Sequence, residues 1–212
     1  MMSKINQDPY HFIGKIYDWL VEPSLSEWRK IALKFSRPTE GMQVLDVGCG
    51  TGSLLKDYQA AGCHISGIDA SPTMLAAARR KLDPDADLRL GSAATMPFAD
   101  GSFDLVTAVY SLHEMPLATR SAGLREMIRV VKPAGRILII EYKSGPYPFP
   151  SGWFSKTSRA IVEWLAGQDH FKNFRQFINQ NGLTHLIEEN HLALLKSWGP
   201  EEGTSAIYLL RH

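Results

Sequence analysis

Residues 44–52 read VLDVGCGTG, and this stretch decides the fold. It ends an almost continuous apolar run, Met42–Val47, that is typical of a strand buried on both faces of a parallel sheet. Gly48, Gly50 and Gly52 follow at alternate positions. Glycine adopts backbone angles that other residues avoid, and it lets a ligand approach the N–H groups at the start of the next helix. The stretch therefore predicts a ligand-binding turn between a strand and a helix.

Strands and helices alternate outward from this turn. The alternation predicts a doubly wound parallel sheet with helices on both faces. The expected strands are Met42–Val47, Cys63–Ile68, Asp87–Leu90, Phe103–Tyr110 and Arg136–Glu141, and the expected helices are Ser53–Ala61, Ser71–Leu82 and one that carries Leu124–Val131 and ends before Pro133.

The flanking regions complete one expected domain over residues 1–212. Ile16–Phe35 predicts two helices separated by Pro23, and Asn173–Asn181 predicts a helix closed by Gly182. His191–Trp198 and Thr204–Arg211 predict an antiparallel hairpin at one edge of the sheet. We expect a helical cap in 1–40, a ligand-binding core in 42–142, a lid-like loop and helix in 145–170, and a C-terminal helix with the hairpin in 171–212.

Composition excludes several classes of protein. The 212 residues are 44% hydrophobic and 21% charged, which is typical of a folded globular chain. The 23 Lys and Arg nearly cancel the 22 Asp and Glu, so we expect no nucleic-acid partner. Cys49 and Cys63 are too few for a disulfide scaffold or a cysteine-only zinc site, and we expect no metal. No apolar run reaches about 18 residues and no secretion signal is visible, so we expect a cytoplasmic protein without an integral membrane segment.

The dinucleotide fingerprint G-x-G-x-x-G is the rival interpretation of the glycines. Gly48 and Gly50 match it, but Ser53 occupies the third glycine position and Gly52 comes one residue too early. The spacing disfavours a nicotinamide-dependent oxidoreductase and leaves it as an alternative.

The glycine stretch resembles the nucleotide loop of class I S-adenosylmethionine (SAM)-dependent methyltransferases. The resemblance continues through GIDAS at 67–71, GSAATMPFADGSFDLV at 91–106 and LREMIRVVKPAGRILIIE at 124–141. MPFADGSFDLV and the ending IIEYKSGP are similar to the ubiquinone/menaquinone C-methyltransferase branch. The resemblance implies a Rossmann-like three-layer α/β sandwich, with a mostly parallel seven-stranded sheet whose last strand is antiparallel, and SAM as the cofactor.

Two carboxylates, Asp69 and Asp46, are the main candidates for binding the implied cofactor. Asp69 ends the second strand about twenty residues after the loop, a spacing that fits a carboxylate accepting both ribose hydroxyls; alternatively, it is an acid at the start of the helix capped by Ser71. Asp46 either supports the loop or lies near the methionyl amine. Ser92 stands where the family often has an acid or asparagine for the adenine, whose contacts would then shift to the backbone of Ala93. The full set that the resemblance implies is Asp46, Gly48, Cys49, Gly50, Thr51, Gly52, Asp69, Ala70, Met74, Ser92, Ala93 and Val109.

The acceptor pocket is expected beside this site. His113 follows the fourth strand and is a candidate general base, because histidine exchanges protons near neutral pH; the alternative is a histidine that only lines the pocket. Tyr17, Tyr110 and Tyr142 are the other candidate pocket residues. The aromatic residues of Gly145–Phe154 either wall this pocket or form a separate hydrophobic cluster. The basic residues at 79–81 are interpreted as solvated.

These observations predict methyl transfer from SAM to a small or lipophilic molecule. C-methylation of a quinone precursor is favoured over N-methylation of an amine or aminolipid, and arsenite methylation is disfavoured because only Cys63 lies outside the glycine loop. A SAM-binding protein without catalysis is a further alternative. The chain is expected to act as a monomer or homodimer.

Overall fold

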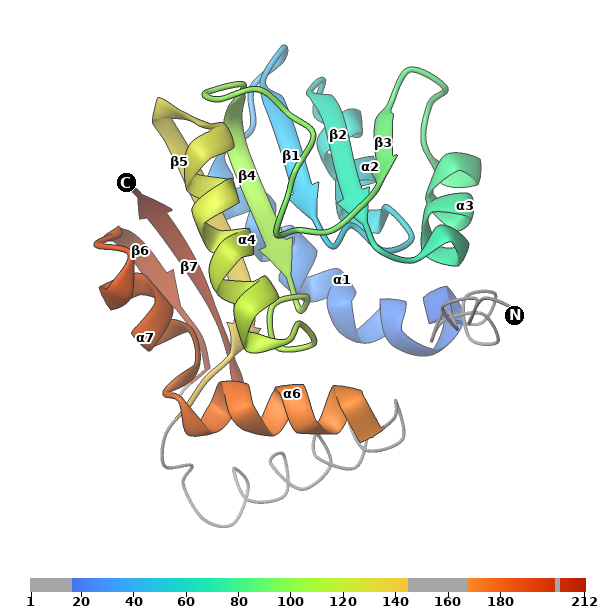
Figure 1. The fold of residues 1–212 in the computed structure, drawn as a ribbon. Coiled ribbons are helices and arrows are strands. Elements are labelled where there is room, and N and C mark those ends of the chain that lie inside the picture. The colour runs from blue at the N-terminus through green and yellow to red at the C-terminus, as the bar shows by residue number, and fades with distance from the viewer. Residues whose placement is uncertain (1–16, 145–167, 201–202) are drawn as a thin grey trace, which may run out of the picture.

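The computed structural model describes residues 17–144, 168–200 and 203–212, with side chains described from Leu25 in the first helix and from Phe171 in the second segment. One seven-stranded sheet has the order β3-β2-β1-β4-β5-β7-β6 (Figure 1). Its strands are β1 (Gln43–Val47), β2 (His64–Asp69), β3 (Asp87–Leu90), β4 (Phe103–Val109), β5 (Val131–Tyr142), β6 (Ala193–Trp198) and β7 (Ser205–Arg211).

Strand directions agree with the expected architecture. β1 to β5 pair in parallel, and β7 pairs antiparallel with both β5 and β6. The mostly parallel sheet with an antiparallel last strand is therefore confirmed. Parallel strands place their carboxyl ends at one edge, which is the edge where open α/β sheets bind ligands.

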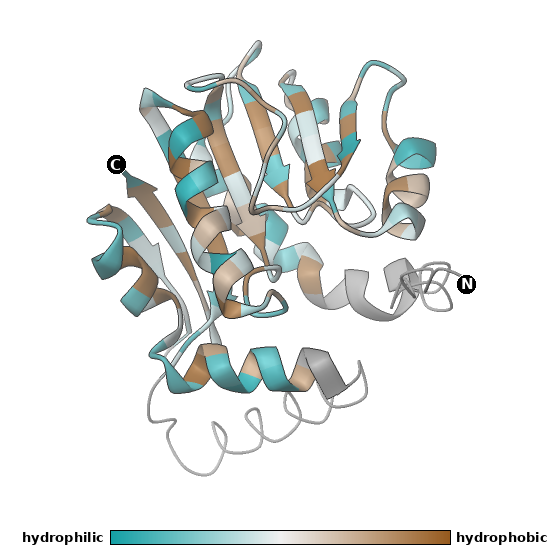
Figure 2. Cartoon of the chain, in the orientation of Figure 1, coloured by the Kyte–Doolittle hydropathy of each residue, from teal (hydrophilic) through white to brown (hydrophobic). Residues whose placement is uncertain are grey.

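Helices cover both faces of the sheet and make three layers (Figure 1). α4 packs with α7 and α6 over one hydrophobic cluster, and α1, α2 and α3 pack over the other. The central strands are mainly hydrophobic in Figure 2, as burial on both faces requires. The helices are α1 (Tyr17–Ser36), α2 (Ser53–Ala60), α3 (Pro72–Lys81), α4 (Leu117–Val130), α6 (Gln168–Asn179) and α7 (Gly182–Glu189).

Local sequence explains where α3 begins. The Ser71 hydroxyl accepts a hydrogen bond from the Met74 N–H at 3.1 Å, and Pro72 occupies the first turn. The serine side chain pairs one of the free backbone N–H groups in the first turn, and proline has no N–H there that needs a partner, so the helix starts with few unpaired donors.

Two expected boundaries were wrong because proline acts differently in each place. α1 runs through Pro23 as one helix, since a proline removes one main-chain donor and can bend a helix without ending it. α4 ends at Val130, before Pro133 as expected, but β5 begins at Val131 instead of Arg136 and includes Pro133. The register to β4 shifts between Phe103 and Leu105, which pair with Val131 and Arg136, so the proline lies in a bulge.

The C-terminal region contains two helices where one was expected. Asn181 and Gly182 have φ angles of 63° and 57°, so they form a left-handed turn between α6 and α7. This turn follows the end of α6 at Asn179, and Gly182 is the first residue of α7. α6 itself starts at Gln168 and crosses the expected boundary at residue 171.

Candidate active site

The glycine loop joins β1 to α2 through three left-handed residues. Gly48, Gly50 and Gly52 have φ angles of 72°, 53° and 77°, as the glycine spacing predicted. A Cβ atom at Gly48 would lie 2.5 Å from the Ser111 Cβ, whereas a Cβ at Gly50 would meet nothing within 4 Å. Gly48 is thus required by packing, and Gly50 leaves the loop open where a ligand can approach.

This difference predicts unequal losses of stability. Gly48→Ala is expected to lower the free energy of unfolding by about 2–4 kcal/mol, from left-handed backbone strain and the clash with Ser111. Gly50→Ala is expected to lose only about 1–2 kcal/mol, because it keeps the strain and lacks the clash. Urea unfolding of both variants measures the difference, and equal losses would contradict the packing role of Gly48.

Asp69 connects the glycine loop to the start of α3. Its Oδ2 accepts a hydrogen bond from the Gly50 N–H at 2.8 Å, and its Oδ1 accepts one from the Ser71 N–H at 2.8 Å. The bond from the Ser71 N–H is the contact expected of an acid at the start of a helix. A carboxylate has about four acceptor positions, so these two bonds are also compatible with ribose hydroxyls.

Asp46 lies beneath the loop with 3% of its surface exposed. Its Oδ1 accepts a hydrogen bond from the Thr107 hydroxyl at 2.6 Å, across the pairing of β1 with β4. Burial raises the pKa of Asp46 to about 7, and the charge of Asp69 adds to the rise, while the Thr107 bond opposes it. Asp46 can therefore change its charge near neutral pH when a cation binds beside it.

The remaining implied cofactor residues lie along the same edge. The Cys49 thiol is buried, and burial raises its pKa, so it stays neutral. Thr51 is also buried and accepts a hydrogen bond from Lys81 Nζ at 3.1 Å. Lys81 also donates to Ser53 at 2.6 Å, so interpreting it as a solvated cation was wrong. Ala70 is exposed, Met74 is buried, and Val109 ends β4 half-buried.

The turn after β3 contains Ser92 and Ala93, the two candidates for hydrogen bonds to the adenine. The Ser92 side chain is exposed, and its hydroxyl accepts a hydrogen bond from the Ala94 N–H at 3.2 Å. Ala93 is buried beside Gly123 of α4, where an added Cβ would come within 3.2 Å of it. The close approach of α4 fixes the backbone of this turn.

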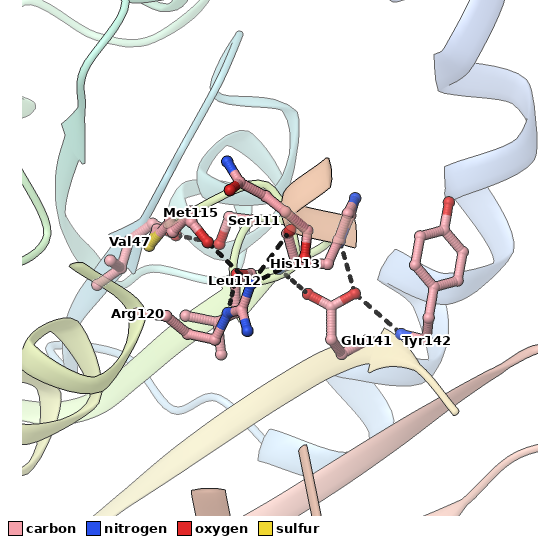
Figure 3. Close-up of polar contacts among 9 residues, drawn as sticks. Val47, Ser111, Leu112, His113, Met115, Arg120, Glu141 and Tyr142 are labelled. Atoms are coloured by element: carbon pink, nitrogen blue, oxygen red, sulfur yellow. Dashed lines mark hydrogen bonds and ion pairs between the residues drawn. The ribbon is translucent and has the colours of Figure 1, made fainter. Parts of the chain in front are cut away.

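His113, in the segment after β4, and Glu141, near the end of β5, form a buried pair (Figure 3). His113 is 2% exposed, Glu141 is fully buried, and His113 Nδ1 lies 2.8 Å from Glu141 Oε1. Glu141 also accepts hydrogen bonds from the backbone N–H of His113 at 3.2 Å and of Tyr142 at 2.9 Å. The carboxylate thus fixes both the ring and the backbone of His113.

Arg120 of α4 holds the segment that carries His113 (Figure 3). It is 1% exposed and donates to the carbonyls of Leu112 at 2.7 Å and Met115 at 2.8 Å. A further bond to the Asn173 carbonyl at 3.2 Å joins the segment to α6. Burial lowers the pKa of Arg120 to about 10, and the charge of Glu141 opposes this effect, so Arg120 stays cationic.

Aromatic rings surround this pair and join it to α1 and α6. The Tyr142 ring centre lies 4.7 Å from that of His113 and 5.2 Å from that of Tyr110. Trp28 of α1 contacts Tyr110, and Phe174 of α6 contacts both Tyr142 and His113. The structure therefore brings Tyr110, His113 and Tyr142 together. The Tyr17 side chain and the aromatic residues of Gly145–Phe154 lie outside the described side chains.

Two residues of this cluster were missed from the sequence, although each leaves a signal there. Glu141 is a charge at the end of the otherwise apolar strand RILIIE. Arg120 lies four residues before Leu124, which places it on the buried face of α4. A charge on a buried face indicates a partner or a site.

The strand order, the glycine loop and the acid at the end of β2 define a Rossmann-like nucleotide-binding protein. A family model described as a methyltransferase domain matches residues 44–135. A demethylmenaquinone methyltransferase of Beutenbergia cavernae is 33% identical over 206 residues, covering 88% of this chain and 85% of that protein. A ubiquinone/menaquinone biosynthesis C-methyltransferase of Geotalea daltonii is 28% identical over 192 residues, covering 77% and 79%. A SAM-dependent methyltransferase structure from Aquifex aeolicus has a TM-score of 0.65 at 20% identity, covering 94% of this chain and 98% of that one.

The chain therefore belongs to the class I SAM-dependent methyltransferases, in the branch similar to the ubiquinone/menaquinone C-methyltransferases. It is an enzyme that uses SAM, and this assignment decides against the oxidoreductase and the non-catalytic alternatives. Within the described residues, no helix is both long enough and apolar enough to span a membrane.

Proposed function

We propose that this enzyme methylates a ring carbon of a demethylated quinol. The observation that carries the proposal is the ring cluster of Trp28, Tyr110, Tyr142 and Phe174 around the buried His113–Glu141 pair. Rings of this kind stack on a flat aromatic acceptor. The names of the relatives from Beutenbergia cavernae and Geotalea daltonii support the same acceptor class.

The segment that carries Tyr110 and His113 adjoins the glycine loop. Ser111 packs against Gly48, and its hydroxyl donates to the Val47 carbonyl at 2.9 Å. His113 is two residues further along the same segment. An acceptor among the rings would therefore lie next to a cofactor on the loop, and this alignment with exclusion of water is the main source of rate enhancement for a methyl transfer.

The loop and its carboxylates fit SAM. The open space over Gly50 admits the nucleoside, Asp69 is the acceptor for the ribose hydroxyls, and Asp46 is the anion for the methionyl amine. When bound, SAM supplies a methyl group whose bond to sulfur breaks, leaving the electron pair on sulfur, as the new bond to the acceptor forms. His113 serves as the base: it takes the proton of the acceptor hydroxyl, so that negative charge spreads to the ring carbon. After the new C–C bond forms, that carbon loses its hydrogen to water as a proton, the ring becomes aromatic again, and His113 returns its proton to the oxygen.

Asp46 predicts how SAM affinity depends on pH. Its pKa of about 7 means that it is protonated below neutrality, and only the ionised form attracts a cationic ligand. Affinity for SAM is therefore expected to rise about 25-fold from pH 5.5 to 7.5 and to level off above about pH 8. Stability of the free protein is expected to change in the opposite direction, because the unfolded state releases this proton from about pH 3.8 upwards.

Calorimetric titration of SAM across this pH range measures the effect. Asp46→Asn, which removes the charge and keeps the shape, is expected to bind more weakly and to lose the pH dependence. An unchanged slope in a folded Asp46→Asn protein would assign the pH dependence to another group.

Transfer of labelled methyl from SAM tests the acceptor. Demethylmenaquinol with a short side chain is compared with an aromatic amine and with phosphatidylethanolamine, and each product is analysed by mass spectrometry. Label on a ring carbon of the quinol is expected. Label on nitrogen alone would replace the proposal with the amine or aminolipid alternative.

A further inference from the structure

We propose that Glu141 is a positioning residue that holds His113 in the tautomer with the proton on Nδ1, so that Nε2 is the atom that receives the acceptor proton. This inference rests on the proposed function for its catalytic meaning, but its structural content can be tested without an acceptor. In the proton transfer, the O–H bond of the acceptor breaks, its electron pair stays on oxygen, and the proton binds Nε2.

The contacts of Glu141 determine its chemical state. Both carboxylate oxygens accept backbone N–H groups, one from His113 and one from Tyr142. An ionised carboxylate accepts all three contacts, whereas a neutral carboxyl group would have to donate its proton to Nδ1 and leave a weaker acceptor for the backbone N–H groups, so the three contacts favour the ionised form. An ionised Glu141 can only accept, and His113 Nδ1 at 2.8 Å must therefore be the donor.

The tautomer follows from this donor role. A neutral imidazole carries one proton, and if Nδ1 carries it, Nε2 is the acceptor nitrogen. The imidazole points one edge at Glu141, which directs its Nε2 edge away from the carboxylate (Figure 3). A buried carboxylate that orients a histidine in this way also stabilises the imidazolium formed when Nε2 takes a proton.

The described neighbours of the ring act on its charge in opposite directions. Among the described residues, the charged or titratable groups that face His113 are Glu141 and Tyr142 of β5 and Arg120 of α4. The α6 residues packed on the ring, Phe174 and Phe177, carry no charge. Arg120 opposes protonation of the ring and Glu141 favours it, and Glu141 makes the direct contact with the ring.

A purely structural role would use the same contacts. With 2% exposure, His113 can meet an acceptor only if a neighbouring side chain moves, and the pair also ties the segment after β4 to β5. The test must therefore measure the protonation state of the ring as well as stability and turnover.

Nitrogen NMR of the full chain labelled with ¹⁵N-histidine provides this measurement. The chain has seven histidines, and the signals of His113 are identified by their loss in His113→Gln. We expect the Nδ1–H tautomer in the wild type at pH 7.5. A wild-type ring with its proton on Nε2 would overturn the proposal before any other variant is made.

Variants of Glu141 then test the cause. Glu141→Gln is expected to lower the pH at which the ring takes its second proton by about 1–3 units, because the anion is lost. Glu141→Asp, which keeps the charge, is expected to lie nearer the wild type. Glu126→Gln is the matched control, since Glu126 is also a carboxylate with little exposure, but its contacts are with Arg129 and the Met96 N–H instead of the His113 ring. The same tautomer and the same titration in a folded Glu141→Gln protein would also overturn the proposal.

Turnover separates this inference from the proposed function. Glu141→Gln is expected to lower kcat on the quinol about 10–100-fold with KM for SAM unchanged. If wild-type enzyme binds SAM but does not methylate the quinol, the proposed function fails while the NMR result still decides the tautomer. If the quinol is methylated and kcat is unaffected in Glu141→Gln, the positioning role fails alone.

Discussion

Replacing His113 with alanine is expected to lower kcat by about 10²–10⁴-fold, the usual contribution of a positioned general base, with little change in SAM affinity. The wild-type rate at saturating SAM is expected to fall at acidic pH, as the ring takes up a proton and ceases to be a base. This acidic limb is expected to vanish in His113→Ala. Steady-state kinetics between pH 5 and 9 with the true acceptor measure both effects.

His113→Gln distinguishes a general base from a residue that only lines the pocket. Glutamine keeps a hydrogen-bonding side chain of similar reach but cannot act as a base near neutral pH. If His113 is the base, both variants lose the acidic limb. A His113→Gln enzyme with most of its activity and an intact acidic limb would show that the histidine only shapes the pocket.

Arg120→Ala is expected to lower the free energy of unfolding by about 3–5 kcal/mol. The change leaves the carbonyls of Leu112 and Met115 without a buried donor and removes the nearby cation from Glu141. The guanidinium also stacks 4.9 Å over the Phe177 ring, so packing between α4 and α6 is lost as well. Urea unfolding measures the loss.

Arg125→Ala is the control on the same helix. Arg125 is exposed, and its replacement is expected to change stability by no more than about 0.5 kcal/mol. Comparable losses for the two arginines would mean that α4 responds to its helix-forming residues and not to the buried contacts of Arg120.

The core of the fold could be predicted because its signals are local. The apolar run ending at Val47, the glycines after it and the cap at Ser71 each specify a backbone conformation within a few residues. The same reasoning was wrong at Pro23, which lies inside α1, and it correctly ended a helix before Pro133 but placed the start of the next strand too late. Whether a proline ends a helix or lies in a bulge depends on how the flanking residues pack. Packing of this kind is set by distant segments and leaves no short sequence pattern.

In the candidate site, too, the positions of some residues could be predicted from the sequence and their contacts could not. The positions of Asp46 and Asp69 follow from strand ends in a parallel sheet, so the sequence placed them at one edge. Their partners could not be inferred, since Thr107 and the Gly50 N–H come from other segments of the chain. The pairing of His113 with Glu141 depends on the register of β4 against β5, which a single sequence does not encode in any short motif.

The hydrogen bonds of the glycine loop have a consequence for the thermodynamics of cofactor binding. The N–H groups of Gly48 and Cys49 both donate to the Ile68 carbonyl, Gly52 donates to Cys49, and Gly50 donates to Asp69. The protein's own hydrogen bonds therefore preorganise the loop. Binding of a ligand then does not have to offset the conformational entropy that ordering the loop would cost. More of the intrinsic contact energy of the nucleoside is then available as affinity, at the expense of any gating that an initially unfolded loop would provide.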